Sequence, residues 1–260
     1  MNKISDAFAN KKAFIPFITA GDPNLDITKE LILAMQEAGA DLIEIGIPFS
    51  DPVAEGPVIQ EADLRSLEAG TTTDKIFDMV CSIKEEIHVP IVFMTYINPI
   101  YVYGTEKFAQ KSKECGVSGV IVPDVPFEEN AEIKDTFNNY DIQVISMIAP
   151  TSSDRVKMIA AEAEGFVYCV SSLGVTGVRT EINTDIASLI QDVKSTKDIP
   201  CAIGFGISNP EQAEKMASIS DGAIVGSAIV KIVAQYGTKC VAEVKKYVKE
   251  MKEAVKRADI

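Results

Sequence analysis

Short apolar runs alternate with longer amphipathic stretches along the whole chain. The runs are rich in β-branched and aromatic residues, whereas the longer stretches have apolar positions three or four residues apart, the spacing of one helix face. Strands and helices that alternate in this order are typical of a parallel sheet covered by helices. We expect eight strands, at residues 14–19, 42–47, 91–96, 119–122, 143–148, 166–170, 201–205 and 223–225.

Several of the expected helices have recognisable ends. A side chain that accepts a hydrogen bond commonly precedes the first turn, proline is favourable at the first helical position, and glycine commonly follows the last turn. These signals predict helices at 27–38 between Asp26 and Gly39, at 106–115 between Thr105 and Gly116, and at 211–217 after Asn209-Pro210.

The repetition predicts an α/β protein, a single-domain (β/α)8 TIM barrel that spans residues 1–260. No Pro/Ser/Gly-rich linker divides the chain, and residues 1–10, with Ile4 and Phe8 four apart, indicate an extra N-terminal helix rather than a signal peptide. An open doubly wound sheet is the alternative. It is weaker because Thr19-Ala20-Gly21-Asp22-Pro23, after the first strand, lacks the Gly-x-Gly-x-x-Gly pattern of such folds.

The last stretch, residues 238–259, is a basic amphipathic helix by its pattern. Six lysines and Arg257 surround one apolar stripe, formed by Val241, Val244, Tyr247, Val248, Met251 and Val255. Such a helix can bind a membrane surface or a partner groove. We favour the last outer helix of the barrel, with a solvated basic face, because surface helices of this kind are common.

Charge and cysteine usage narrow the class of protein. The formal net charge of -13 argues against nucleic acid or an anionic membrane as a partner, so an anionic substrate must be held by local groups. No apolar run approaches the length that spans a membrane. The cysteines are odd in number and widely spaced, and we expect reduced, buried thiols in a cytoplasmic protein: Cys81, Cys115, Cys169, Cys201 and Cys240.

Glu44 is the most informative polar residue. It lies inside an apolar strand, where it shares one face with Leu42 and Gly46. A buried carboxylate is costly unless it is paired, and no expected strand contains Lys, Arg or His. An acid in this position should be harder to ionise than a free Glu, as general acid/base catalysis requires. The alternative is a structural acid that backbone groups or a water molecule satisfy.

Two further acids follow expected strands, at the end of the barrel where catalysis takes place in this fold. Glu55 lies in the long polar segment 47–57, and it is either a working acid or a helix-start acid favoured by the helix dipole. Asp124 ends the fourth strand, where it could orient another group or cap the next helix.

Glycines follow the last three strands, at Gly174 and Gly177, at Gly204 and Gly206, and at Gly226. Glycine lets backbone N–H groups approach an anion, and a helix start adds positive potential. Gly226-Ser227 at the start of a helix therefore predicts a phosphate site, although small residues also serve tight turns.

The single histidine, His88, precedes the third strand, at the opposite end from the predicted site. This position excludes a His-ligated metal and a Ser-His or Cys-His nucleophile pair. Carboxylates, backbone amides and a tyrosine, Tyr168 or Tyr96, remain. The residues thus predict a barrel enzyme that acts on a small phosphorylated molecule by proton transfer through Glu44, without a metal.

Three groups of motifs resemble the tryptophan synthase α subunit family over essentially the whole chain. They are residues 16–23 (PFITAGDP), the long segment 44–60 (EIGIPFSDPVAEGPVIQ), and the glycine segments at 174–177, 204–208 and 226–230. The resemblance implies a (β/α)8 barrel lyase that cleaves indole-3-glycerol phosphate to indole and glyceraldehyde 3-phosphate by a retro-aldol step. In that reaction indole C3 gains a proton, the side-chain hydroxyl loses one, and positive charge develops at the indole N–H.

The resemblance also implies a role for each matching residue. Glu44 is the acid/base at C3 and the hydroxyl, Glu55 is the loop acid that faces the indole N–H, and Tyr168 lies beside the indole. The phosphate cradle is Gly177, Phe205, Gly206, Gly226 and Ser227; the indole wall is Phe17, Ile59 and Tyr96; Thr176 closes over the site. The chain departs from the family at Glu55, where Asp is more usual, and at Ser171-Ser172-Leu173, where some members have Ser-Arg. An extra methylene moves a carboxylate by about 1 Å, a displacement that can cost roughly 100-fold in rate.

The resemblance implies an α2β2 heterotetramer for the synthesis of L-tryptophan. A β subunit would carry pyridoxal phosphate and receive the indole, and this chain would hold no cofactor. The partner face would be formed by the segments around Asp51, Asn98-Pro99 and Asp124-Val125-Pro126. Two alternatives remain: a stand-alone indole-3-glycerol-phosphate lyase, and a regulatory partner of the β subunit with weak activity of its own.

Overall fold

The computed structural model describes residues 3–170, 182–204 and 206–259, apart from the side chains of residues 182–185. The strands are all parallel and lie within or close to the expected segments: β1 (Ala13–Thr19), β2 (Ile43–Gly46), β3 (Ile91–Met94), β4 (Gly119–Ile121), β5 (Gln143–Val144), β6 (Ser146–Ile148), β7 (Val167–Val170), β8 (Cys201–Gly204) and β9 (Gly222–Val225). They form one sheet in the order β5-β4-β3-β2-β1-β9-β8-β7-β6, and the barrel prediction is confirmed.

The fifth expected strand, 143–148, is divided in two, because it is where the barrel closes. Its first half, β5, pairs with β4, and its second half, β6, pairs with β7. Ile145 lies between them, and its N–H donates to Val120 O at 2.9 Å. One segment of chain therefore forms both edges of the sheet, so the sheet is nearly a closed cylinder.

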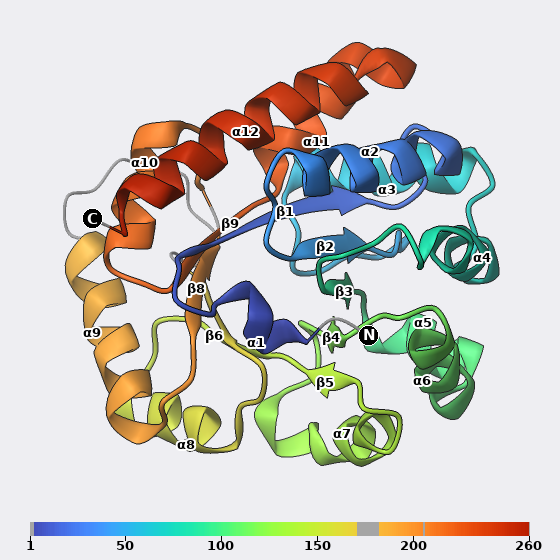
Figure 1. Ribbon diagram of the computed structural model, residues 1–260. Helices are drawn as coiled ribbons and strands as arrows, with labels where there is room; N and C mark the ends of the chain where they lie inside the picture. The colour runs from blue at the N-terminus through green and yellow to red at the C-terminus, as the bar shows by residue number, and fades with distance from the viewer. Residues whose placement is uncertain (1–2, 171–181, 205, 260) are drawn as a thin grey trace.

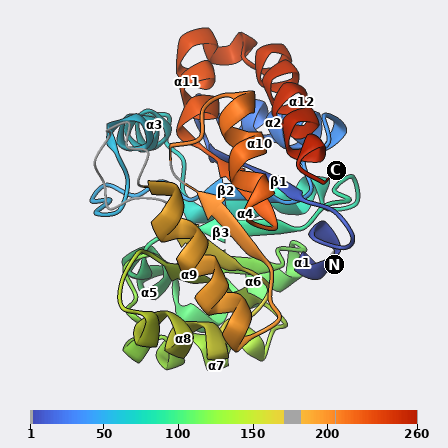
Figure 2. The ribbon, with the colours of Figure 1, turned by 90° about the vertical axis from the view of Figure 1, so that its left-hand side faces the viewer.

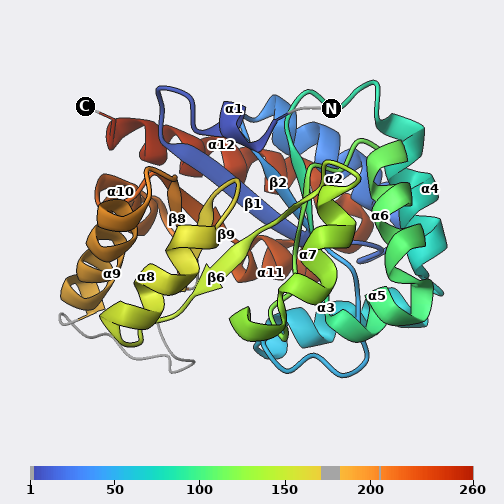
Figure 3. The same cartoon turned by 90° about the horizontal axis from the view of Figure 1, so that it is seen from below.

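The helices lie outside the sheet, with the exception of the short α1 (Figure 1). Figure 2 shows α10 over β8 and β9, and Figure 3, from below, shows α7 and α8 on either side of β6. Their bounds are α1 (Ile4–Ala7), α2 (Leu25–Glu37), α3 (Pro57–Glu68), α4 (Thr73–Ile83), α5 (Ile97–Tyr103), α6 (Thr105–Glu114), α7 (Ala131–Asn138), α8 (Ser153–Glu162), α9 (Ile182–Thr196), α10 (Pro210–Ser218), α11 (Ser227–Tyr236) and α12 (Val241–Arg257), with 3₁₀ turns at Phe127–Glu129 and Gly237–Lys239.

Alternation along the strands separates two packed layers. Inward residues such as Leu42 and Val92 pack inside the barrel together with Ile4 and Ala7 of α1. Outward residues such as Ile43 pack against the surrounding helices. The N-terminal helix is thus confirmed as a short element that covers the amino end of the barrel interior, and Glu44 shares the inward face with Leu42.

Helix starts were predicted with mixed success. Asn209 accepts from Gln212 N–H as expected, whereas the start of α2 is capped by Asn24, which accepts from Ile27 N–H at 2.9 Å. Asp26 lies in the first turn instead, where its charge suits the helix dipole. The helix at 105–114 has Gly104 at its N-cap position and no side-chain cap from Thr105.

The C-terminal helix α12 packs along α2 and α10 as an outer helix, next to them in Figure 1. Val244, Val248 and Met251 are fully buried, as the apolar stripe predicts. One expectation was wrong: Lys252 does not belong to a solvated face, since it is only 5% exposed. Its ammonium group contacts the carboxylate of Asp41 across the amino end of the barrel.

The expectation that all five cysteines are reduced was also wrong. Cys81 in α4 and Cys115 directly after α6 form a disulfide, because these two helices are neighbours outside the barrel although 34 residues separate the two positions. Linear spacing carries no information about such a pair. Cys169, Cys201 and Cys240 are free and buried, as expected. Within the described residues, no helix combines the length and apolar character needed to cross a membrane.

Candidate active site

Glu44 lies in the middle of β2 and faces the barrel interior. It is 1% exposed, and its strand neighbours are Phe17 in β1 and Val92 in β3. Its Oε2 atom has no hydrogen-bond partner in the described part of the chain. Burial, with a smaller contribution from the charge of Glu55, raises the pKa of Glu44 to about 8. The side chain therefore holds a proton at neutral pH and can both give and take one.

Two described cations near the barrel are paired with other acids. Arg65 in α3 holds Asp22, with Nε–Oδ1 and Nη2–Oδ2 distances of 2.9 and 2.8 Å, and Lys252 holds Asp41 at the amino end. None of the ion pairs found among the described residues involves Glu44. The expectation of a carboxylate without a cationic partner agrees with this geometry.

Glu55 lies in the loop between β2 and α3 and contacts a tyrosine. The hydroxyl of Tyr96 donates to Glu55 Oε2 and accepts from Ala54 N–H at 2.9 Å. The ring of Tyr96 packs against Phe49, with centroids 5.3 Å apart. Burial and the charges of Asp63 and Asp124 raise the pKa of Glu55 to about 7, while a backbone hydrogen bond opposes the rise. Among the described side chains, Tyr96 thus holds this loop acid.

Tyr168 reaches the same interior from β7. Burial, followed by the charges of Glu44 and Glu55, raises its pKa well above the ordinary value, so its hydroxyl keeps its proton. A Cβ on Gly204 would lie 2.3 Å from the Tyr168 hydroxyl oxygen, which shows why glycine is needed there. The barrel interior therefore brings together the three residues predicted from the sequence, Glu44, Glu55 and Tyr168.

An apolar wall adjoins two of the glycine positions. Phe17 packs with Ile59, Ala62 and Val230, which joins β1 to α3 and α11. A Cβ on Gly46 would lie 2.6 Å from the Phe17 ring, which leaves no room for a side chain, and a Cβ on Gly226 would lie 3.2 Å from it, a tight contact. The predicted wall and the predicted phosphate cradle are thus in contact.

The start of α11 has the geometry of an anion site. Gly226 is the N-cap, and its carbonyl oxygen accepts from Ile229 and Val230 N–H, so the first turn points its remaining N–H groups outward. Ser227 and Gly206 are both exposed, and Gly206 has φ +78°. Thr176, Gly177 and Phe205, together with the Ser171-Ser172-Leu173 segment, lie outside the described residues.

Asp124 does not cap the helix that follows it. Its Oδ1 atom accepts from Ile97 N–H at 3.0 Å, so it supports the start of α5, the helix that precedes it in the chain. The segment Asn98-Pro99 belongs to this helix and is not a loop.

Asp63 in α3 was not predicted. It is 5% exposed, and burial, together with the charge of Asp22, raises its pKa to about 7, while a backbone hydrogen bond from Phe49 opposes the rise. The sequence contained a usable signal, because Asp63 follows Ile59 by one helical turn and therefore lies on the apolar stripe of α3.

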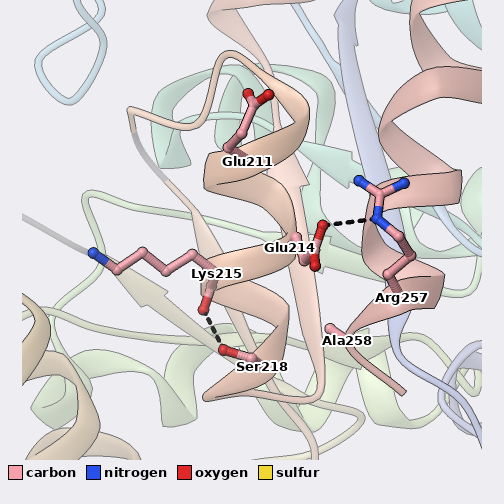
Figure 4. Close-up of a pocket in the computed structure, with 6 residues that line it drawn as sticks. All are labelled: Glu211, Glu214, Lys215, Ser218, Arg257 and Ala258. Carbon is pink, nitrogen blue, oxygen red and sulfur yellow. Dashed lines mark hydrogen bonds and ion pairs between the residues drawn. The ribbon is translucent and has the colours of Figure 1, made fainter. Parts of the chain in front are cut away.

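A surface pocket between α10 and α12 differs from the predicted phosphate region in the charges that line it. Figure 4 shows Arg257 directed at Glu214, with an Nε–Oε2 distance of 2.8 Å, while Lys215 points away from it. The basic groups there do not converge, and Glu211 adds a further acid. The pocket does not favour an anion.

Comparison with known proteins agrees with the geometry. Residues 5–256 match the family model described as tryptophan synthase alpha chain. The chain is 47% identical over 262 residues to the tryptophan synthase alpha chain of Caldanaerobacter subterraneus subsp. tengcongensis, with 98% of this chain and 100% of that protein covered. It is also 47% identical over 256 residues to that of Lactiplantibacillus plantarum, with coverage of 98% and 97%.

Solved structures give the same result. Tryptophan synthase subunit alpha from Legionella pneumophila superposes with a TM-score of 0.89 at 34% identity, with 99% of both chains covered. A chain of the tryptophan synthase α2β2 complex from Pyrococcus furiosus gives 0.87 at 37% identity, with 94% of this chain and 99% of that one covered. The chain therefore belongs to the tryptophan synthase alpha chain family.

Proposed function

We propose that this chain is the α subunit of a tryptophan synthase and catalyses its α reaction, the cleavage of indole-3-glycerol phosphate to indole and glyceraldehyde 3-phosphate. The observation that carries the proposal is Glu44, a fully buried carboxyl with no cationic partner among the described residues, together with an apolar wall and a helix start suited to phosphate. The relatives named tryptophan synthase alpha chain match this chain over nearly their whole length.

The proposed steps follow from proton balance. Glu44, protonated at neutral pH, gives its proton to indole C3, and its carboxylate then takes the proton of the side-chain hydroxyl as the carbon–carbon bond breaks. Glu44 gives one proton and takes one proton, so it ends the reaction in its starting protonation state. Because burial places its pKa near 8, the protonated form is present at neutral pH, and the same group can take a proton back.

The other residues bind and orient the substrate. The carboxylate of Glu55 accepts from the indole N–H and offsets the positive charge that develops there. Tyr168 offers a neutral hydroxyl beside the ring, and Phe17, Ile59 and Tyr96 surround the apolar ring. Backbone amides at Gly206, Gly226 and Ser227 hold the phosphate, with Gly177 and Phe205 completing the cradle and Thr176 closing over it.

We further propose that the chain works in an α2β2 heterotetramer, whose β subunit holds pyridoxal phosphate and takes up the indole. Exposed apolar residues on the predicted partner face support this: Val53, two residues from Asp51, is 80% exposed, and Val102 in α5 is 81% exposed. The Pyrococcus furiosus relative is described as part of a mutually activating α2β2 complex.

Indole release by the purified chain, alone and with a β subunit, tests the proposal. We expect slow release by the chain alone and a large increase in the complex, because the partner face adjoins the loop that holds Glu55. Full activity without a partner would instead support a stand-alone lyase. No release in either sample would support a regulatory partner and overturn the catalytic assignment.

A further inference from the structure

Thr19, the last residue of β1, has a buried hydroxyl without a partner. The residue is 2% exposed, and its Oγ1 atom makes no hydrogen bond within the described part of the chain. The other such side-chain atoms among the described residues are Glu44 Oε2, Thr95 Oγ1 and Ser112 Oγ. A buried hydroxyl without a partner is costly, because it has lost its hydrogen bonds to water. The unpaired hydroxyl of Thr19 is therefore explained if a ligand pairs with it.

Alternation along β1 places the Thr19 side chain on the inward face of the barrel. Ala13 and Ile15 pack inside the barrel. Phe14 and Ile18, at the alternate positions, pack against the outer helices. Thr19 follows Ile15 by four residues and therefore shares its face, at the carboxyl end of the strand. In this fold the carboxyl ends of the strands surround the active site, so the hydroxyl is directed into the barrel mouth.

The neighbours of Thr19 on this face offer no partner for its hydroxyl. Gly46, its partner in register on β2, has no side chain. The apolar ring of Phe17 covers Gly46 so closely that a Cβ there would lie 2.6 Å from it. Glu44 is opposite Phe17 in register, which makes it the diagonal neighbour of Thr19. The mouth therefore contains Thr19 Oγ1 and Glu44 Oε2 on neighbouring strands, each without a partner among the described residues.

Strand order places Thr19 between the two ends of the proposed substrate site. β1 lies between β2, which carries Glu44, and β9, which leads into Gly226 and Ser227 at the start of α11 (Figure 1). A substrate that is held by its phosphate at α11 and exchanges a proton with Glu44 therefore passes the carboxyl end of β1. The other inward side chains of this strand are apolar, so Thr19 is its polar contribution to the mouth.

The proposed substrate carries a group that suits this hydroxyl. Its glycerol chain has two hydroxyls between the indole ring and the phosphate. The first, next to the ring, gives its proton to Glu44 in the reaction. The second, next to the carbon that bears the phosphate, takes no part in bond breaking, yet it loses water on binding and needs a partner in the site. The hydroxyl of Thr19 can donate to it or accept from it, and adds no charge.

We propose that the Thr19 hydroxyl binds the second hydroxyl of the glycerol chain and makes the site specific for a hydroxylated substrate. The inference rests on the proposed function and deepens it. Because this hydroxyl is the same before and after the carbon–carbon bond breaks, the contact stabilises the bound substrate and the transition state equally. Loss of the contact should therefore appear in KM rather than in kcat.

Matched variants and matched ligands isolate this one contact. Thr19→Val keeps the branched shape and removes the hydroxyl, whereas Thr19→Ser keeps the hydroxyl; Thr19→Ala serves if the valine variant does not fold. Thr95→Val is the control, because Thr95 is equally buried and unpartnered but lies at an outward position after β3. The free chain is used in the Glu44→Gln background, which blocks turnover. Its Kd is measured for indole-3-glycerol phosphate and for indole-3-propanol phosphate, which lacks both hydroxyls.

We expect Thr19→Val to weaken the binding of indole-3-glycerol phosphate by about 10-fold and to leave the Kd of the propanol ligand within about 2-fold. Thr19→Ser should stay within about 3-fold for both ligands, and Thr95→Val should change neither. With Glu44 intact and the β subunit present, Thr19→Val should raise KM by about 10-fold and leave kcat within about 3-fold. Its urea midpoint should equal or exceed that of the wild type, because an unsatisfied hydroxyl has been removed.

Equal weakening of both ligands in Thr19→Val would mean that Thr19 only shapes the site, and it would overturn the proposal. Unchanged binding of both ligands in that variant would overturn it as well. A wild-type complex that releases no indole would contradict the proposed function instead. The Kd values do not depend on turnover, so they would still decide whether Thr19 binds the hydroxylated chain.

Discussion

Two buried carboxyls at the two ends of one short segment show how surroundings decide function. Asp41, 7% exposed, lies just before β2 at the amino end of the barrel, and Glu44, 1% exposed, lies within β2. Asp41 contacts two ammonium groups and a backbone N–H: Lys252 Nζ at 2.5 Å, Lys11 Nζ at 2.7 Å and Phe14 N at 2.7 Å. Glu44 has no such partner among the described residues, and its Oε2 is unsatisfied.

The same burial therefore gives opposite chemistry. Around Asp41, two lysines offset the cost of a buried charge and join the N-terminal segment, β1 and α12, so the carboxylate is a fixed structural charge. Around Glu44 no described residue offsets that cost, and the group holds its proton up to about pH 8. The proposed catalytic acid thus differs from the structural acid because no cation among the described residues pairs with it.

The largest expected effect comes from removing the unpaired acid. Glu44→Gln keeps the shape of the side chain and removes its ability to exchange a proton. We expect kcat for indole release to fall by about 100- to 10,000-fold, with the Kd for substrate within about 3-fold, because the phosphate and ring contacts remain. Single-turnover and equilibrium binding measurements on the complex check this. Residual turnover above about a tenth of the wild type would refute the role of Glu44.

Removal of the cation that pairs with Asp41 should lower the stability of the protein and leave its activity unchanged. Lys252→Ala leaves Asp41 buried with only the half-exposed Lys11, and breaking such a pair typically costs about 3 to 5 kcal/mol. Urea denaturation should show this loss, with kcat unchanged where the variant is folded. Lys249→Ala, on the exposed face of α12, is the control and should stay within about 0.5 kcal/mol of the wild type. Equal losses of stability in Lys252→Ala and Lys249→Ala would show that the buried ion pair contributes no more to stability than an exposed lysine does.

The difference between Asp41 and Glu44 also explains how much of the fold could be predicted from the sequence. Strand alternation placed Leu42 and Glu44 on the inward face correctly, because period and burial are local properties of the chain. The partner of Asp41 could not be predicted, since Lys252 lies 211 positions away and its helix pattern is that of an ordinary basic surface. The disulfide between Cys81 and Cys115 was missed for the same reason, because only the packed helices bring it together.

The candidate site residues that could be identified from the sequence are those whose signal lies in the sequence pattern itself. Glu44 could be identified because the absence of basic residues from every strand is visible in the sequence. The contact of Tyr96 with Glu55 and the position of Asp63 depend on how the loop folds back over β3 and α3, which the sequence pattern does not describe. Glu55 was thus singled out without its partners.

Stability against pH distinguishes the two carboxyls further. The folded state raises the pKa of Glu44 from 4.5 to about 8, so between these values only the folded state keeps the proton. Stability should therefore fall as the pH rises through this interval, by up to roughly 5 kcal/mol relative to Glu44→Gln, and be constant below it. Urea midpoints of the two proteins, measured between about pH 4 and about pH 9, check the sign. A difference that does not vary with pH would contradict the raised pKa.

A cation placed beside Glu44 should make it resemble Asp41. Met94 faces inward on β3, diagonally across from Glu44, and Met94→Lys would bring an ammonium group within reach. We expect the pKa of Glu44 to fall by about 1 to 3 and kcat at neutral pH to fall by roughly 10-fold, since less of the acid form remains. Met94→Gln, of similar length but uncharged, is the control. Matching pH profiles of kcat for the two variants would contradict the electrostatic explanation.

Glu55 is the intermediate case, and it carries the smallest expected effect. Its side-chain partner among the described residues is not a cation but the hydroxyl of Tyr96. Glu55→Asp withdraws the carboxylate by about 1 Å, and the loop that holds it can move by that amount; we expect kcat/KM within about 10-fold of the wild type.

Tyr96→Phe should then cost less in the Glu55→Asp background than in the wild type, because the shortened acid no longer depends on the hydroxyl. A double-mutant cycle of kcat/KM measures this difference. Complete loss of activity in Glu55→Asp would mean that the loop is built around the longer side chain, and that the Tyr96 contact fixes Glu55 as firmly as Lys252 fixes Asp41.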